Sequence, residues 1–273
     1  MATLAGKTLF ITGASRGIGA AIAVRAARDG ANIAIVAKTD RPHPKLPGTI
    51  HTTAQAVEKE GGRALALAVD IRDAEAVATA VERTADSFGG IDILVNNASA
   101  IWLAGAAETP LKRFDLMLDV NLRGSFICSQ ACLPFLRKAD NPHILNLAPP
   151  PNLDPRWFRD HVAYTISKYG MSLCALGMAE EFRDDGIAVN TLWPRTVIAT
   201  AALAMLGGLV KPEQCRKPEI VADAAQAILV RPARECTGRH FIDDEALAEA
   251  GITNLDDYAV APGTPLATDL FLD

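Results

Sequence analysis

The sequence has few aromatic residues, no excess of positive charge and no long apolar run, and each shortage excludes a class of protein. Phe, Trp and Tyr make up 5% of the 273 residues, whereas hydrophobic residues make up 49%. A sizeable core must therefore be built mainly from aliphatic residues and alanine. The formal net charge is −5, which argues against a nucleic-acid-binding surface.

Membrane-spanning and disulfide-linked proteins are disfavoured as well. No apolar run approaches the roughly 18 residues that a membrane-spanning helix needs. The N-terminal residues lack the apolar region of a signal peptide and lead directly into a strand-like run. The five cysteines are odd in number and scattered, so they suggest neither a disulfide framework nor a metal site. We therefore expect a cytoplasmic protein with no bound metal and with no membrane or nucleic-acid partner.

Short apolar runs alternate with helix-like segments along almost the whole chain. Runs typical of buried strands occupy residues 7–12, 31–37, 64–69, 91–95, 144–147, 187–192 and 238–242. Helices are expected over residues 20–29, 52–60, 73–88, 110–138 with a break near residue 124, 164–184 and 218–229. The alternation predicts an α/β fold, a doubly wound, Rossmann-type parallel sheet of about seven strands with helices on both faces.

Three segments do not fit this alternation. Residues 38–47 contain three prolines and are expected to form a loop. Residues 196–215 are expected to form short helices in a mobile flap. Residues 243–273 form an acidic tail that we expect to be rich in loops. No composition change marks a domain boundary, so we expect a single domain over residues 1–273 with this tail at its end.

A glycine-rich segment follows the first predicted strand and precedes a helix. Glycines at this place allow a tight turn and let backbone N–H groups approach a pyrophosphate, which the helix dipole also attracts. The strand–loop–helix context therefore predicts a dinucleotide site. The residues of this predicted site are Gly13, Ser15, Arg16, Gly17, Ile18 and Gly19.

The ends of the second and third predicted strands indicate which dinucleotide binds. An acidic residue after the second strand would favour a free ribose 2′-hydroxyl, but Lys38 stands there. Lys38, together with Arg16, can pair with a 2′-phosphate, so NADP(H) is favoured over NAD(H). The alternative is that both are solvated surface cations. Asp70, after the third strand, can accept a hydrogen bond from adenine, cap a helix, or do both.

Tyr164 and Lys168 are four residues apart in a helix-compatible run. Residues i and i+4 share one helix face, so both side chains can point into one pocket. A nearby cation is expected to lower the pKa of the Tyr164 phenol and make it a useful general acid. The alternative is that both side chains lie on a solvated helix face.

These motifs together resemble the short-chain dehydrogenase/reductase family over nearly the whole chain. Residues 12–19 resemble its cofactor loop, Asp70–Ile71 its adenine contact, and residues 96–99 its turn along the cofactor. The resemblance implies an oxidoreductase that acts on a small-molecule substrate and forms a homodimer or homotetramer. The site residues that it implies are catalytic Tyr164, Lys168 and Asn121, and cofactor-binding Asp70, Ile71, Asn97 and Lys168.

The chain departs from the family pattern at two places. The family has a serine after the fifth strand that binds the reacting oxygen, whereas this chain has Ala148-Pro149. Loss of one such donor costs about 10²–10³ in rate, and Asn152 is a candidate to replace it. Arg195 stands where glycine is usual and could narrow or charge the pocket; the alternative is a surface arginine.

Three hypotheses of function remain open. The first is an NADP(H)-dependent oxidoreductase with an apolar substrate. The second is a cofactor-binding protein with little or no catalysis, because the serine is missing. The third, a lipid-binding module, is suggested only by animal relatives that carry an added sterol-carrier-like domain. Trp157 and Phe158 could line a substrate pocket or pack in the core, and His161 is a weak candidate for a base.

Overall fold

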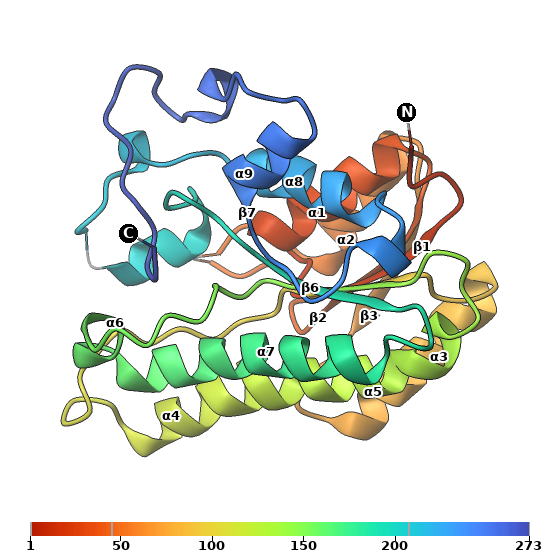
Figure 1. Ribbon diagram of the computed structural model, residues 1–273, viewed down its shortest axis with the longest axis horizontal. Coiled ribbons are helices and arrows are strands. Elements are labelled where there is room, and N and C mark those ends of the chain that lie inside the picture. The colour runs from red at the N-terminus through yellow and green to blue at the C-terminus, as the bar shows by residue number, and fades with distance from the viewer. Residues whose placement is uncertain (1, 45, 207, 273) are drawn as a thin grey trace.

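Seven parallel strands form one sheet at the centre of the protein (Figure 1). The computed structural model describes residues 2–44, 46–206 and 208–272. The remaining four positions fall in the predicted N-terminus, proline-rich loop, flap and tail, and lie outside the described residues. The strand order is β3-β2-β1-β4-β5-β6-β7, with every neighbouring pair parallel. The predicted doubly wound fold is therefore confirmed.

The strands lie close to their predicted positions. They are β1 (Thr8–Thr12), β2 (Asn32–Ala37), β3 (Arg63–Ala68), β4 (Ile93–Asn96), β5 (His143–Asn146), β6 (Ala188–Trp193) and β7 (His240–Ile242). β1, β2, β4, β5 and β6 are buried over their whole length. Strands covered on both faces are expected to be apolar throughout rather than alternating, which is why they were visible in the sequence.

Helices cover the sheet in two layers (Figure 1). The upper layer in this view contains α1 (Gly17–Arg28), α2 (Ile50–Lys59), α8 (Glu219–Leu229) and α9 (Asp243–Glu249). The lower layer contains α3 (Ala74–Phe88), α4 (Leu111–Met117), α5 (Gly124–Leu136) and α7 (Val162–Glu181), and the short α6 (Arg156–Arg159) precedes α7. None of the described helices is long and apolar enough to cross a membrane.

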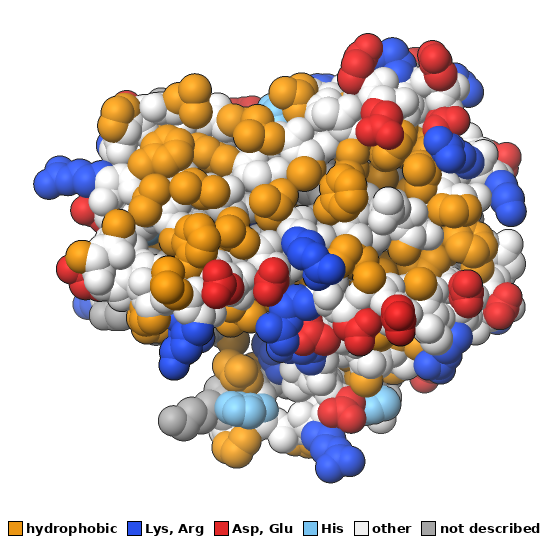
Figure 2. All heavy atoms as spheres, turned by 90° about the horizontal axis from the view of Figure 1, so that it is seen from below, with side chains coloured by type: hydrophobic (Ala, Val, Ile, Leu, Met, Phe, Trp, Pro, Cys, Tyr) orange, Lys and Arg blue, Asp and Glu red, His pale blue; other side chains and the backbone are white. Residues whose placement is uncertain are grey.

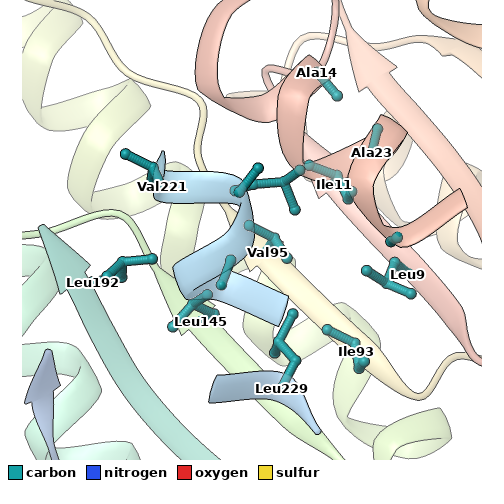
Figure 3. Close-up of a cluster of buried hydrophobic side chains, with 14 of the residues drawn as sticks. Leu9, Ile11, Ala14, Ala23, Ile93, Val95, Leu145, Leu192, Val221 and Leu229 are labelled. Atoms are coloured by element: carbon teal, nitrogen blue, oxygen red, sulfur yellow. The ribbon is translucent and has the colours of Figure 1, made fainter. Parts of the chain in front are cut away.

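Each face of the sheet has its own hydrophobic core. Leu9 and Ile11 of β1 belong to the core beneath α1 and α8, whereas Phe10 between them belongs to the core on the opposite face. Successive strand residues point to opposite faces, so one strand supplies both cores. Figure 3 shows the first core, to which Ile11 of β1, Val95 of β4 and Val221 of α8 each contribute a side chain.

The long helix predicted over residues 110–138 is divided. α4 ends at Met117, a π-helical segment follows over Leu118–Arg123, and α5 begins at Gly124. The break expected near Gly124 is therefore this π-helical segment immediately before it. Such segments are rare and often occur at functional sites, and this one carries Asn121.

The tail is rich in loops beyond residue 249, as predicted, but it begins with a helix that we did not predict. α9 follows β7 directly, with Asp243, Asp244 and Glu245 in its first turn. Acidic side chains stabilise the N-terminal end of a helix, so the charge that we interpreted as a sign of a tail is instead a helix start. Beyond α9 the chain returns along the flap, where Thr196 pairs with Thr268. The flap itself contains two short 3₁₀ helices, Ala201–Leu206 and Pro212–Gln214, as expected.

Candidate active site

Tyr164 and Lys168 lie one turn apart on α7 and line the same pocket, as their spacing predicts. The pocket has a volume of about 190 Å³. Leu147, just after β5, and Trp193, the last residue of β6, form part of its wall. The pocket therefore lies at the carboxyl ends of the strands, where doubly wound folds bind their ligands.

The Lys168 ammonium is buried and has polar and aromatic partners. Its Nζ donates to the main-chain oxygen of Leu147 (2.6 Å) and lies 5.2 Å from the centre of the Trp193 ring. Burial lowers the pKa of Lys168 to about 7, and the carboxyl of Asp269 opposes that decrease. Lys168 is therefore poised between its charged and neutral forms near neutral pH.

The expected decrease of the Tyr164 pKa is wrong for the protein without a cofactor. Burial raises the pKa of Tyr164, and the nearby carboxyl of Asp269 raises it further. The phenol is 5% exposed, so a phenolate would lose most of its hydration. The Lys168 ammonium that was expected to stabilise the phenolate donates to Leu147 instead.

Asn121 connects the π-helical segment to α7 and to the segment after β4. Its Oδ1 accepts from the Ala100 N–H (2.7 Å), and its Nδ2 donates to the Ala100 carbonyl and to Ser167 Oγ, both at 2.9 Å. Ser167 Oγ in turn donates to the main-chain oxygen of Tyr164 (2.7 Å). Asn121 is fully buried, so its amide fixes the position of the active-site helix.

The glycine loop is shaped by its contact with Asn97. The Asn97 Nδ2 donates to the carbonyl oxygens of Thr12 (2.8 Å) and Gly13 (3.2 Å). A Cβ on Gly13 would lie 2.7 Å from the Cα of Ala98, and one on Gly19 would lie 2.4 Å from Asn97 Nδ2. Gly13 and Gly19 are therefore required by packing against the end of β4. Gly13 and Gly17 also have positive φ values (+67° and +59°) that favour glycine.

This packing predicts opposite effects for two glycine-to-alanine substitutions. We expect Gly19→Ala to lower the free energy of unfolding by about 1–3 kcal/mol, because its Cβ meets Asn97 Nδ2 and the Gly13 carbonyl. Gly177→Ala on α7 is the matched control: nothing lies within 4 Å of its added Cβ, so stability should rise by about 0.5–1 kcal/mol. Urea unfolding of both variants measures this, and equal effects would contradict it.

A cleft of about 520 Å³ contains almost all of the predicted cofactor residues. α1 begins in this cleft, and no side chain caps its first N–H groups. These free N–H groups, the helix dipole and the open space fit a pyrophosphate. The predicted cofactor residues that line the cleft are Gly13, Ser15, Arg16, Gly17, Ile18, Lys38, Asp70, Ile71 and Asn97.

The cleft and the Tyr164 pocket share part of their walls. Ile18, Asn97, Ser99 and Ile101 line both, as does Thr200 of the flap. Lys168 lies in the pocket and not in the cleft, at the end opposite to Lys38 and Asp70. An extended molecule can therefore reach from Asp70, past the start of α1, to Tyr164.

The charged residues at the far end of the cleft pair with one another. Arg72 binds the Asp70 carboxylate with its guanidinium (closest distance 2.6 Å), and Lys38 Nζ lies 3.6 Å from it. The hydrogen bond from Arg72 contributes most to holding the pKa of Asp70 at about 2. The alternative role of Asp70 as a helix cap is wrong, because Asp73 caps α3.

Arg16 contacts the proline-rich loop. Its Nε donates to the Pro47 carbonyl (2.7 Å) and its Nη2 donates to the Gly48 carbonyl (3.1 Å). These bonds place the guanidinium beside the loop that follows Lys38, at the rim of the cleft. Arg16 therefore closes one side of the space next to Lys38.

Neither Asn152, the candidate to replace the serine, nor Arg195, the second departure from the family pattern, lines the pocket. Asn152 is absent from the pocket wall, and its Oδ1 accepts from the Asp154 N–H (2.9 Å). Arg195 pairs with Asp244 (3.1 Å) and with Glu245 at the start of α9. Asn152 therefore does not replace the serine, and Arg195 does not charge the pocket.

The aromatic residues before α7 pack in a cluster rather than line the pocket. Trp157 lies 6.0 Å from the Phe271 ring, and Phe158 lies 5.6 Å from the Tyr169 ring. The Nδ1 of His161 is 2.9 Å from Thr165 Oγ1, where it holds the first turn of α7. Core packing, rather than substrate binding or base catalysis, is the observed arrangement.

Sequence reasoning missed the contribution of the C-terminal residues to this site. Asp269 and Leu270 line the Tyr164 pocket, and the Phe271 ring stacks on that of Tyr164 at 6.1 Å. No local motif surrounds these residues. The only signal was an apolar run at the end of an acidic tail.

Comparison with known proteins agrees with this geometry. Residues 7–206 match the sequence model of the short chain dehydrogenase family. The chain belongs to this family. A short-chain dehydrogenase of Mycobacterium thermoresistibile is 54% identical, with a TM-score of 0.94 over 99% of this chain and 96% of the other. Hydroxysteroid dehydrogenase-like protein 2 of Xenopus tropicalis is 60% identical over 270 residues.

The match to that Xenopus protein covers 99% of this short-chain dehydrogenase but 64% of the relative, so the chain spans less than two thirds of its length. Solved proteins of the same fold bind either nicotinamide cofactor. One from Mycobacterium paratuberculosis holds NAD (23% identity, TM-score 0.76, over 88% of this chain and 97% of the other). A metagenomic short-chain oxidoreductase holds NADP. It is 25% identical, with a TM-score of 0.72 over 88% of this chain and 97% of the other.

Proposed function

We propose that this short-chain dehydrogenase is an NADP(H)-dependent oxidoreductase that interconverts a carbonyl and an alcohol on an apolar small molecule. The observation that carries the proposal is the shared wall between the Tyr164 pocket and the glycine-loop cleft. The nicotinamide supplies or accepts the hydride when the cofactor is bound. The start of α1 would bind the pyrophosphate, and Asp70 and Ile71 would bind the adenine.

Tyr164 is the proposed proton donor in the direction of reduction. Its phenol gives a proton to the carbonyl oxygen while hydride reaches the carbonyl carbon. Lys168, with a pKa of about 7, can return a proton to Tyr164 and bind the nicotinamide ribose. A chain of waters behind Lys168 would carry protons to solvent, and Asn121 would help to hold that chain from its fixed position beside Ala100 and Ser167.

The lining of the pocket supports the proposal of an apolar substrate. Ile101, Leu147, Trp193, Val197 and Ile198 line it, and apolar walls favour ligands that lose little hydration on binding. The experiment that tests the function is a screen of aliphatic and alicyclic ketones and aldehydes, with NADPH consumption followed by absorbance. Absence of turnover over the whole panel would favour the alternative of a cofactor-binding protein without catalysis. That alternative gains support from Ala148, which is fully buried and has no hydroxyl group.

Lys38 is expected to select the cofactor. Charge-assisted bonds to an anion contribute about 1.5–3 kcal/mol, so Lys38→Ala should weaken NADPH binding by at least about 10-fold. NADH, which has no 2′-phosphate, should bind unchanged. Fluorescence titration with both nucleotides measures this, and Lys59→Ala, an exposed position on α2, is the control. Tighter binding of NADH than NADPH by the wild type would reject the roles given to Arg16 and Lys38.

We also propose that the protein forms a homodimer or homotetramer through α5 and α7. Phe126 of α5 and Ile166, Leu173 and Leu176 of α7 are 44–58% exposed. Figure 2, which views the molecule from the side on which these helices lie, shows broad apolar areas. Such areas on a soluble domain often mark protein interfaces.

The assembly can be tested at Leu173. Leu173→Asp should convert the assembly to monomers, because a carboxylate would be desolvated in the interface. Light scattering coupled to size-exclusion chromatography measures the mass, with Leu153→Asp, at an 81% exposed position outside both helices, as the control. A wild-type monomer would reject this interface.

The five cysteines are free in the structure, which supports the proposed cytoplasmic setting.

A further inference from the structure

Residues 267–272 are bound into the wall of the active site rather than extending into solvent. The Ala267 N–H donates to Gln214 (2.9 Å) and the Asp269 N–H donates to Arg195 (3.0 Å), both at main-chain oxygens. The Trp193 indole donates to the Leu270 carbonyl (2.9 Å). These bonds attach the segment to the flap, to the residue after Pro194 and to the end of β6, so its position relative to the pocket is fixed.

Phe271 anchors the segment in a conformation that costs energy. Among the described residues it is the one non-glycine residue with positive φ (+73°), an arrangement that costs about 1–3 kcal/mol and persists only where packing enforces it. The ring is 1% exposed and contacts the rings of Tyr164, Trp193 and Tyr169 at 6.1, 5.8 and 5.2 Å. The strained residue therefore lies directly against the ring of Tyr164.

Asp269, two residues before Phe271, lines the pocket together with Tyr164 and Lys168. The Leu270 N–H donates to one carboxyl oxygen (2.7 Å), which leaves the other oxygen available to the pocket. Burial raises the pKa of Asp269 to about 7; Asp243 adds to the increase, and Lys168 opposes it. The titratable groups that interact with this carboxyl are Tyr164 and Lys168 of α7, Asp243 of α9, and Cys215 of the flap.

The rest of the described pocket wall lacks a short hydroxyl donor at the place where the family has its serine. Ala148 follows Leu147, and the carbonyl oxygen of Pro149 accepts from Ser172 Oγ (2.6 Å). A neutral carboxylic acid can stabilise developing negative charge by donating its O–H, and apolar surroundings keep it neutral. Asp269 therefore lies in the same pocket as Tyr164, and its burial favours the protonated form that this task needs.

We propose that Asp269 is a further catalytic residue, whose protonated carboxyl donates a hydrogen bond to the reacting oxygen of the substrate. The proposal rests on the oxidoreductase function proposed above. In reduction, hydride adds to the carbonyl carbon, and the phenol O–H of Tyr164 breaks to give its proton to the oxygen. Asp269 keeps its own proton throughout and stabilises the negative charge before that transfer. One preorganised donor of this kind contributes about 10²–10³ in rate.

Two substitutions at Asp269 test whether the side chain acts as a hydrogen-bond donor. Asp269→Ala removes the donor and should lower kcat by about 10²–10³-fold with a smaller change in KM. Asp269→Asn keeps a donor of the same shape and should retain kcat to within about 10-fold. Asp256→Asn, at an exposed position of the same tail, is the control and should match the wild type. NADPH titration shows whether each variant still binds cofactor and is folded.

The pH profile gives a readout that a structural role would not change. The wild-type rate of reduction should fall as pH rises through about 7, because the Asp269 carboxyl and the Lys168 ammonium both lose their protons there. Asp269→Asn should show a shallower fall, since only Lys168 still titrates. Equal rates for Asp269→Ala and wild type, or equal losses for Asn and Ala, would overturn the proposal while leaving the oxidoreductase function intact. A wild type that reduces no carbonyl in the panel would overturn both.

Discussion

Tyr164→Phe is expected to lower kcat/KM for carbonyl reduction by about 10²–10⁴-fold, the usual contribution of a positioned general acid. The substitution removes only the phenol oxygen and keeps the ring that packs on Phe271. The fold should therefore persist, and the affinity for NADPH should change little. Stopped-flow measurement of NADPH oxidation at saturating cofactor, beside a binding titration, separates loss of the proton donor from loss of the site.

Tyr169→Phe is the matched control for this experiment. Tyr169 lies on the same helix and also contacts the Phe271 ring, at 5.2 Å, but it does not line the pocket. Its variant should keep nearly full activity. If Tyr164→Phe retains wild-type turnover, Tyr164 is not the proton donor. If both variants lose activity equally, the cause is disturbed aromatic packing rather than missing acid chemistry.

Lys168→Met is the second substitution with a large expected effect. It should lower kcat/KM by at least about 10²-fold, since the proton return to Tyr164 and the proposed bond to the ribose are both lost. Methionine is of similar length and apolar, so the buried space stays filled. Lys138→Met, at an exposed position after α5, is the control and should behave as wild type. Activity retained by Lys168→Met would exclude Lys168 from the mechanism.

The same variant should change how stability depends on pH. Burial lowers the folded-state pKa of Lys168 from 10.5 to about 7, so between these values the unfolded chain binds more protons than the folded one. The free energy of unfolding of the wild type therefore rises with pH across this window. Each pKa unit is worth about 1.4 kcal/mol, so the Lys168 contribution is on the order of a few kcal/mol.

Methionine does not titrate, so Lys168→Met lacks this contribution. Its stability relative to wild type should be highest near pH 7 and should decline as pH approaches 10.5, the pKa of an unburied lysine. Urea unfolding at a series of pH values measures the difference, and the Lys138→Met control should show no such trend. If the difference in free energy of unfolding between Lys168→Met and wild type does not depend on pH, then the pKa of Lys168 is not lowered in the folded protein.

The cofactor site was predictable because its signals are local. Gly13, Gly17 and Gly19 stand between one strand and one helix, and the same short stretch forms the start of α1. The reason for two of these glycines was not predictable, because it is a contact with Asn97, about 80 residues away in sequence. The glycine motif therefore identifies the cofactor site, although the contact that makes glycine necessary comes from a distant part of the chain.

The pKa of Tyr164 shows why a pairwise argument was insufficient. The spacing to Lys168 correctly places both side chains in one pocket, yet it carries no information about burial or about Asp269. Burial of the phenol and the negative charge of the Asp269 carboxyl both oppose its ionisation. The sequence also suggested Arg195 as a pocket residue, but ion pairs with Asp244 and Glu245 turn it toward α9.

The sequence by itself determined the doubly wound fold, the glycine loop and the pairing of Tyr164 with Lys168, because apolar runs, turns and helical spacing act over a few residues. Only the tertiary structure decided that the C-terminal residues line the Tyr164 pocket. Asp269 reaches it from more than a hundred residues away, held by Phe271 in the aromatic cluster and by main-chain bonds to Arg195. Such a placement depends on packing between distant segments, and no local pattern encodes it.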